Sequence, residues 1–209
     1  VSGKFAIDLP GGGAIWATED PNLGQPALSV SASSVVPFDG SRVTKPVQFY
    51  LRSNYPDFAE RYEVAIYRGN DTDLVAPIAT LPMDVAGVSR NEWDGTLPSE
   101  YPFRAGDELV YVLRAHDAEG NVDETYPRRL QLVRPEDAER GGLQLRDNVE
   151  KSLGTALTVE QAQTQSLIDG AFAQNDLRQQ NIPIYGSRVR IQGRNLPERS
   201  GLKINGESY

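Results

Sequence analysis

The chain has 209 residues, of which 39% are hydrophobic and 24% charged, with a formal net charge of −8 and a pI near 4.8. This composition is ordinary for a soluble globular protein, and the acidic balance argues against a nucleic-acid or an anionic-membrane partner. The chain has no cysteine, one histidine, no apolar window of about 18 residues and no charged-then-apolar leader at Val1, so thiol chemistry, disulfides, His-rich metal sites, a transmembrane segment and a signal sequence are not expected.

Residues 1–25 are predicted to form an N-terminal strand that leads into the next domain. Three consecutive glycines precede Ile15 and Trp16, which are expected to begin a strand. The glycine run lacks the Lys-Ser/Thr ending and the following helix pattern of a phosphate-binding loop. It is therefore predicted to be a flexible or tightly turning connection.

Residues 26–134 show the period-two alternation of half-buried strands, as where Val47, Phe49 and Leu51 alternate with their neighbours. Six or seven short strands separated by Gly, Pro, Asn and Asp predict a mainly β fold, an antiparallel β-sandwich of the Ig-like or fibronectin III-like kind. The strands are expected at residues 27–32, 46–54, 61–68, 77–81, 88–93 and 109–116, and around Leu130 and Leu132.

Residues 135–180 are predicted to be a partly helical connector. The segment begins with a charged run that ends in a glycine pair, which suits a linker. A helix is expected at about residues 158–178, because Thr158 followed by Gln161 is a capping-box pattern. Residues 181–209 return to short β runs with a hairpin signal at Asn205-Gly206, and are predicted to start a second, partial β domain.

Oxygen-bearing side chains occupy alternate positions after the strand at 109–116. Asp117, Glu119, Asn121 and Asp123 are therefore a candidate calcium loop, since Ca²⁺ takes oxygen ligands from loops of this kind. No other cofactor is expected. The glycine at the fourth position and the missing closing glutamate differ from the EF-hand pattern, and a turn between two strands accounts for the same residue types. Both interpretations stay open.

Two tyrosines are candidate ligand residues. By alternation Tyr50 and Tyr67 lie opposite the main apolar rows, where aromatic rings could stack on a sugar. The alternative, which the large apolar contribution of aromatics in small sandwiches favours, is that these rings are core or sheet-cover residues. His116 ends a predicted strand without a partner at a recognisable catalytic spacing, so it is predicted to be structural. No catalytic constellation is found in the sequence, and a non-enzymatic protein is predicted.

The Trp93-Asp-Gly95 motif precedes a strand that ends in Ala115-His-Asp-Ala-Glu-Gly-Asn121. This pair of motifs resembles the closing half of bacterial Ig-like repeats, such as the Ig-like domain of the flagellar hook-capping protein. The order of motifs from Gly12 to Val189 is also similar to that of large envelope proteins of the outer-membrane protein A (OmpA) family that carry Ig-like modules. The resemblance implies strand and turn positions and no catalytic residue. It does not extend to the peptidoglycan-binding domain of that family.

The motifs and the resemblance predict a non-enzymatic structural or interaction module of a bacterial cell-envelope or surface protein, placed in the periplasm, at the outer membrane or on the cell surface. Such a module acts as a spacer or as a scaffold for a protein partner within the envelope, through its sheet edges and loops. Two alternatives stay open: a carbohydrate-binding module that uses exposed aromatics, and an adhesin repeat stiffened by calcium.

Overall fold

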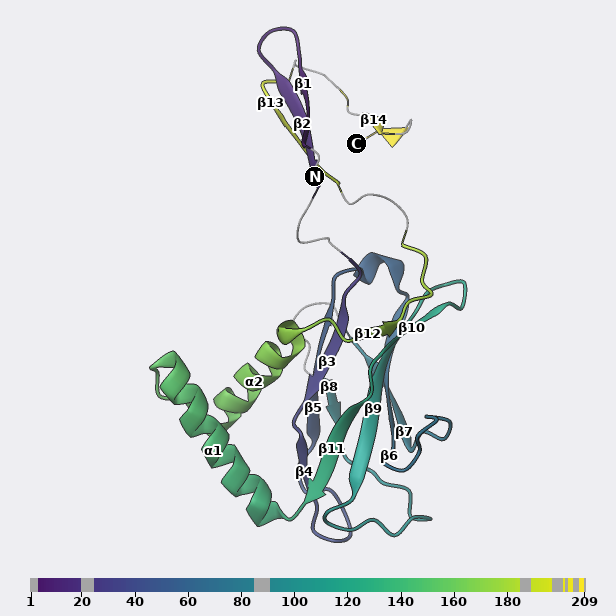
Figure 1. Cartoon of the computed structure of the whole chain (residues 1–209), viewed down its shortest axis with the longest axis vertical. Coiled ribbons are helices and arrows are strands. Elements are labelled where there is room, and N and C mark those ends of the chain that lie inside the picture. The colour runs from purple at the N-terminus through teal and green to yellow at the C-terminus, as the bar shows by residue number, and fades with distance from the viewer. Residues whose placement is uncertain are drawn as a thin grey trace. The chain divides into compact units, whose positions relative to one another are not determined.

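The computed structural model describes residues 4–19, 25–84, 91–184, 189–196, 201, 203–204 and 207–208. The fold is mainly β, as the alternation predicts. The chain divides into two compact units (Figure 1). Pro26–Ile184 is called the sandwich body below, and residues 1–25 together with residues 185–209 are called the small unit.

Two sheets form the sandwich body. The first contains β3 (Leu28–Ala32), β5 (Val47–Ser53) and β8 (Asn91–Trp93). These strands pair antiparallel in the order β3-β5-β8. A short 3₁₀ helix, η2 (Pro56–Phe58), follows β5.

The second sheet is built around one long central strand. Its strands are β4 (Val35–Pro37), β6 (Arg61–Arg68), β7 (Ala79–Met83), β9 (Glu108–His116), β10 (Val122–Thr125), β11 (Arg128–Val133) and β12 (Leu177–Gln179). β9 pairs with β6 along one side and with β10 and then β11 along the other. β7 extends the sheet beyond β6, β12 extends it beyond β10, and β4 pairs in parallel with β11.

The facing surfaces of the two sheets enclose one hydrophobic core. In β5 the predicted inner residues Val47, Phe49 and Leu51 are buried. The Phe49 ring meets the Tyr111 ring of β9 edge-on, with the ring centroids 5.3 Å apart. Full burial of a large apolar side chain contributes about 1.5–3 kcal/mol, so this core is the main source of stability in the body.

The turn after β8 explains the Trp-Asp-Gly motif. Trp93 is buried in the core, and Asp94 Oδ1 accepts a hydrogen bond from the backbone N–H of Thr96 at 2.9 Å. Gly95 has a φ of +78°, in the left-handed region that favours glycine. A Cβ atom at this position would lie 2.3 Å from the Cβ of Val43. The motif therefore shapes a turn.

Helix α1 (Pro135–Leu153) occupies the start of the segment predicted as a connector. Proline at the first helical position and two acidic residues in the first turn favour a helix start. The glycine pair inside it does not end the helix. Gly142 is buried, and a Cβ there would lie 3.0 Å from Cγ1 of Val159, so this glycine permits close packing of two helices.

Helix α2 (Val159–Ala173) is the helix that the capping box predicts. Thr158 Oγ1 accepts a hydrogen bond from the Gln161 N–H at 3.1 Å, and Gln161 Oε1 accepts one from the Thr158 N–H at 2.8 Å. The predicted start is confirmed, whereas the helix ends at Ala173 and not near residue 178. Neither described helix combines the length and the apolar character needed to cross a membrane.

Helix α2 packs on the outer face of β3 and β5 (Figure 1). Ser29 Oγ donates a hydrogen bond to the carbonyl oxygen of Ala171 at 2.6 Å. A Cβ at Gly170 would lie 2.7 Å from Ser31 Oγ. Glycine lowers helix stability by about 1 kcal/mol relative to alanine, and here its small size lets the helix approach the sheet.

After α2 the chain returns to the sheets through residues 174–184, called the return segment below. It contains β12, and its Ile182 is buried in the core. Asn175 Oδ1 accepts a hydrogen bond from the Leu28 N–H at 3.0 Å, and Asn175 Nδ2 donates one to the Pro26 carbonyl at 2.8 Å. The return segment is thus joined to the first strand of the body.

The strands of the small unit come from two chain segments, one before and one after the sandwich body in the sequence. Its sheet contains β1 (Lys4–Asp8), β2 (Ala14–Glu19) and β13 (Val189–Arg194), in the antiparallel order β1-β2-β13. The glycine run forms the β1–β2 turn, where the Leu9 N–H donates to the Gly13 carbonyl at 2.7 Å.

A separate hairpin of β14 (Lys203–Ile204) and β15 (Glu207–Ser208) also belongs to the small unit. It flanks the predicted turn at Asn205-Gly206, and the turn residues themselves lie outside the described part of the chain.

The unit boundaries differ from those that the sequence predicts. The body ends at Ile184 instead of residue 134, because both helices and the return segment belong to it. Residues 1–25, predicted as a lead-in, share a unit with most of the segment predicted to start a second domain. Local periodicity does not report such pairings, since the two segments meet only in the folded chain.

We expect Gly170→Leu to destabilise the sandwich body by about 1–3 kcal/mol, because the leucine side chain would clash with Ser31 where the helix packs on the sheet. Gly141→Ala is the matched control, because a Cβ added at this helical glycine would have nothing within 4 Å. The control should stabilise the chain by about 0.5–1 kcal/mol. Urea unfolding followed by circular dichroism measures both. Equal effects of the two variants would contradict the proposed contact.

Candidate functional site

The predicted calcium loop forms the turn of the β9–β10 hairpin. Asp117 Oδ1 accepts hydrogen bonds from the backbone N–H groups of Glu119 and Asn121, at 3.0 and 2.8 Å. Asp117 Oδ2 accepts one from the Asn121 amide at 2.7 Å. These hydrogen bonds, led by that of the Asn121 side chain, lower the pKa of Asp117. Its carboxylate is engaged in organising the turn.

Asp123, the last predicted ligand, is fully buried on β10 and interacts with other segments. Its Oδ2 accepts a hydrogen bond from the Tyr55 hydroxyl at 2.8 Å. Its Oδ1 accepts two, from the backbone N–H groups of Asn181 at 2.6 Å and Ile182 at 2.8 Å. Asp123 therefore joins β10 to the return segment.

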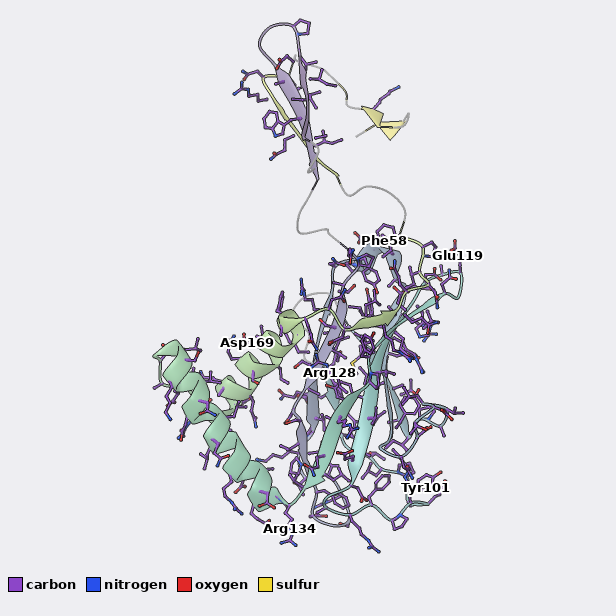
Figure 2. All side chains as sticks on the ribbon, in the orientation of Figure 1. Phe58, Tyr101, Glu119, Arg128, Arg134 and Asp169 are labelled. Atoms are coloured by element: carbon purple, nitrogen blue, oxygen red, sulfur yellow. The ribbon has the colours of Figure 1, made fainter. Side chains whose placement is uncertain are left out.

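The structure does not bring the four predicted calcium ligands together. Asp117 and Asn121 contact each other, Asp123 is occupied in the interior, and Glu119 is exposed at the hairpin tip (Figure 2). Within the described residues there is no group of three or more His, Asp or Glu side chains placed to hold a metal ion. The contacts of Asp117 with Glu119 and Asn121 are those of a turn between two strands.

Tyr50 and Tyr67 do not form a common platform. Tyr67 is only 1% exposed, in a small cluster with Ala65 and Val112 that is covered by Leu74. Tyr50 is half-buried on β5, which belongs to the other sheet. Alternation correctly places both rings on outer faces. The two rings lie on different sheets, and Leu74 covers the Tyr67 ring.

Exposed aromatic rings occur elsewhere on the body. Tyr101 lies at the end of the body opposite Glu119 (Figure 2). The Arg68 guanidinium carbon is 4.6 Å from the centroid of the Tyr101 ring and 5.8 Å from that of Phe103. This stacking attaches the loop after β8 to the end of β6.

Two groups of charged side chains lie on the outer face of the second sheet. In the first, Arg114 Nε donates to Glu124 Oε2 at 2.7 Å, and Arg178 of β12 also donates to Glu124. Glu124 is buried, so its two guanidinium partners compensate the cost of removing the carboxylate from water. The pairs connect β9, β10 and β12 side by side.

His116 belongs to the second charged group. Arg61 donates to His116 Nδ1 at 3.1 Å, and because a guanidinium cannot accept, Nδ1 is the acceptor. A neutral His116 then carries its proton on Nε2, which lies 3.1 Å from Glu63 Oε1. Arg61 also pairs with Glu63 at 2.8 Å. The contacts agree with the predicted structural role of His116.

Asp176 is a buried acid that the sequence gives no reason to single out. It lies in the return segment, where its Oδ2 is 2.8 Å from an Nη atom of Arg128 and its Oδ1 accepts from Gln174 at 2.9 Å. Its backbone N–H donates to the Leu28 carbonyl at 3.0 Å, and its carbonyl accepts from the Tyr126 N–H at 2.7 Å. Asp176 thus joins the return segment to both sheets.

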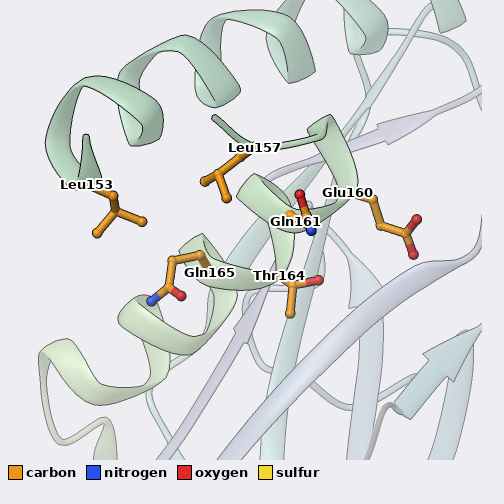
Figure 3. A pocket seen from close by; sticks show the side chains of 6 residues that line it. All are labelled: Leu153, Leu157, Glu160, Gln161, Thr164 and Gln165. Atoms are coloured by element: carbon orange, nitrogen blue, oxygen red, sulfur yellow. The ribbon is translucent and has the colours of Figure 1, made fainter. Parts of the chain in front are cut away.

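Shallow hollows occur where α1 turns into α2. One holds about 350 Å³, and in Figure 3 Leu153 and Leu157 stand across from side chains of α2. Its lining residues are Leu153, Leu157, Glu160, Gln161, Thr164 and Gln165. The Leu153 side chain is exposed, with 53% of the residue accessible to solvent. This hollow, called the groove below, is open to solvent and has a partly apolar lining.

Comparisons of the chain with protein-family models, with curated proteins and with solved structures find no match. The fold, the contacts described above and the motifs of the sequence are therefore the basis for a proposal about function.

We expect Tyr55→Phe to destabilise the sandwich body by about 1–3 kcal/mol at neutral pH, because Asp123 Oδ2 would lose its hydroxyl donor inside the protein. Tyr101→Phe, at an exposed ring, should change stability by less than about 0.5 kcal/mol. Urea unfolding measures both free energies. A Tyr55 variant as stable as the Tyr101 variant would show that Asp123 finds another donor.

Stability should also fall in alkali. Burial, reinforced by the Asp123 charge, raises the pKa of Tyr55, and burial raises that of Tyr111 to about 12. An unfolded tyrosine ionises near pH 10, so above that pH the unfolded state loses protons that the native state keeps. Each such group then removes up to about 1.4 kcal/mol per pH unit. Unfolding measured between about pH 9 and 11 should show a smaller slope for Tyr55→Phe than for Tyr101→Phe. Equal slopes would contradict this assignment.

Proposed function

We propose that this chain is a non-enzymatic structural and interaction module of a bacterial cell-envelope or surface protein, with an Ig-like sandwich as its main body. The division of strands supports the Ig-like assignment. β3, β5 and β8 match the A, B and E strands of one Ig sheet, and β6, β9 and β11 match the C, F and G strands of the other. The envelope location is supported by the resemblance of the Trp-Asp-Gly and strand motifs.

One observation carries the proposal of a non-enzymatic role. The buried acids Asp123, Glu124 and Asp176 are each engaged by hydroxyl, backbone or guanidinium donors that connect strands. An acid that serves as a catalytic base or nucleophile has to face a substrate, usually in a pocket beside other reactive groups. These three acids instead hold the fold together, which is the use expected in a scaffold.

The α1–α2 hairpin is the part of the body that we propose for partner binding. Its exposed residues include Leu153, and the groove beside it is open. Residues 135–173 carry seven acidic and three basic side chains. A partner that supplies an apolar anchor next to basic side chains would complement both features. The alternative of a carbohydrate-binding module finds less support at Tyr50 and Tyr67, because Leu74 covers the Tyr67 ring.

The hairpin makes a testable prediction. Leu153→Ser should weaken binding of an envelope protein partner by about tenfold or more, since it removes the apolar anchor site. Leu143→Ser is the matched control, because Leu143 is similarly exposed on α1, at 47%, and does not line the groove. Both exposed substitutions should leave stability nearly unchanged.

The measurement is retention of proteins from a cell-envelope fraction on the immobilised full chain, at low and at high salt. The proposal expects a basic partner whose retention falls with salt and with Leu153→Ser alone. Retention lost equally in the Leu143 variant would place binding elsewhere. Retention of no envelope protein, or of polysaccharide instead, would contradict the proposed role.

A further inference from the structure

The small unit closes a very long loop. β2 and β13 pair over six positions, from Ala14 with Arg194 to Glu19 with Val189. Residues 20–188 separate the paired strands, and this stretch contains the whole sandwich body. The sandwich is therefore inserted between two neighbouring strands of one sheet.

The folded body holds its own two ends together. At its start, the Ala27 N–H donates to Asn54 Oδ1 at 2.8 Å, and the Pro26 carbonyl accepts from Asn175 at 2.8 Å. At its end, Ile182 is held by Asp123, which also accepts from the Tyr55 hydroxyl next to Asn54. The first and the last residues of the body are thus held by one connected set of hydrogen bonds.

This arrangement changes the entropy of closing the loop. When the body is folded, only about ten residues remain as connections between β2 and β13, whereas an unfolded body leaves roughly 170. The probability that chain ends meet falls as about the three-halves power of loop length, so the pairing becomes less favourable by on the order of 50-fold. We infer that β13 pairs stably with β2 only while the sandwich body is folded. The folded body, called the clasp below, acts by shortening the loop between these two strands.

The small sheet is too weakly stabilised to compensate for less favourable pairing of β13 with β2. In the register of the sheet, Ile7, Ile15 and Ile191 share one face, and Ile7 and Ile191 are 46% and 37% exposed. A two-stranded hairpin left without its third strand is marginal in water. Loss of the clasp therefore releases β13, and an event that opens the sandwich is transmitted to the small unit through chain connectivity.

The full chain contains one tryptophan in each unit, which makes the inference testable. Trp93 is buried in the body, and the Trp16 indole N–H donates to Gln192 on β13 at 3.0 Å. Leu113→Asp places a charge in the core of the full chain and should unfold the body, as the Trp93 indole resonance reports. We expect hydrogen-exchange protection of residues 189–194 to fall by on the order of 50-fold, with loss of the native Trp16 resonance. Leu153→Asp, the same change at an exposed leucine, should alter neither.

A disulfide between β2 and β13 tests whether the sandwich body stabilises β13 by shortening the loop between the two strands or by some other interaction. The chain has no cysteine, so Glu19→Cys with Val189→Cys introduces a single crosslink at paired positions, where Cα atoms of antiparallel strands lie within disulfide range. In the Leu113→Asp background the oxidised crosslink should restore protection, and reduction should remove it. A second cysteine pair, Thr18→Cys with Arg190→Cys, tests the neighbouring paired position. Hydrogen-bonded and non-hydrogen-bonded pairs alternate along antiparallel strands, so the two crosslinks cover both kinds of pair.

Two results would overturn the inference. Protection of residues 189–194 that is unchanged by Leu113→Asp would show a small unit independent of the body. Protection that neither crosslink restores would show that the sandwich supports β13 by something other than closure.

Discussion

The buried carboxylate of Asp123 constrains the whole sandwich body. A charge removed from water is tolerated only when donors surround it, and its donors come from η2's neighbour Tyr55 and from the backbone of the return segment. The early and late parts of the body therefore reach their native arrangement together. β11 and β12 lie toward opposite ends of the body, and the α1–α2 hairpin connects them along the chain (Figure 1).

The same use of polar burial recurs in the body. Asp176 joins the return segment to both sheets through Arg128 and backbone partners, and Glu124 joins three adjacent strands through two arginines. Breaking a buried pair of this kind costs more than forming it gains, because one charge is left unpaired inside the protein. The pairs thus specify which segments lie together. This property suits a module whose role is to hold a surface in place.

The features that the sequence predicts well are local ones. The capping box of Thr158, the turn at Gly95 and the alternation in β6 each depend on residues within a few positions of one another. Helix α1 is not predicted, because Gly142 looks like a break until Val159 is placed beside it. The burial of Tyr67 under Leu74 and the role of Asp176 depend on contacts between distant segments, which no periodicity encodes.

The joining of β3 to the return segment has a consequence for the way the chain folds during synthesis. Leu28 is made 147 residues before Asn175, whose side chain, with the backbone of Asp176, completes the hydrogen bonds of Leu28. Contacts so distant in sequence form slowly, and domains generally fold as units as they emerge from the ribosome. The edges of these strands therefore stay unpaired until the return segment has been made. Nascent chains of this protein should be clients of the chaperones that shield such edges.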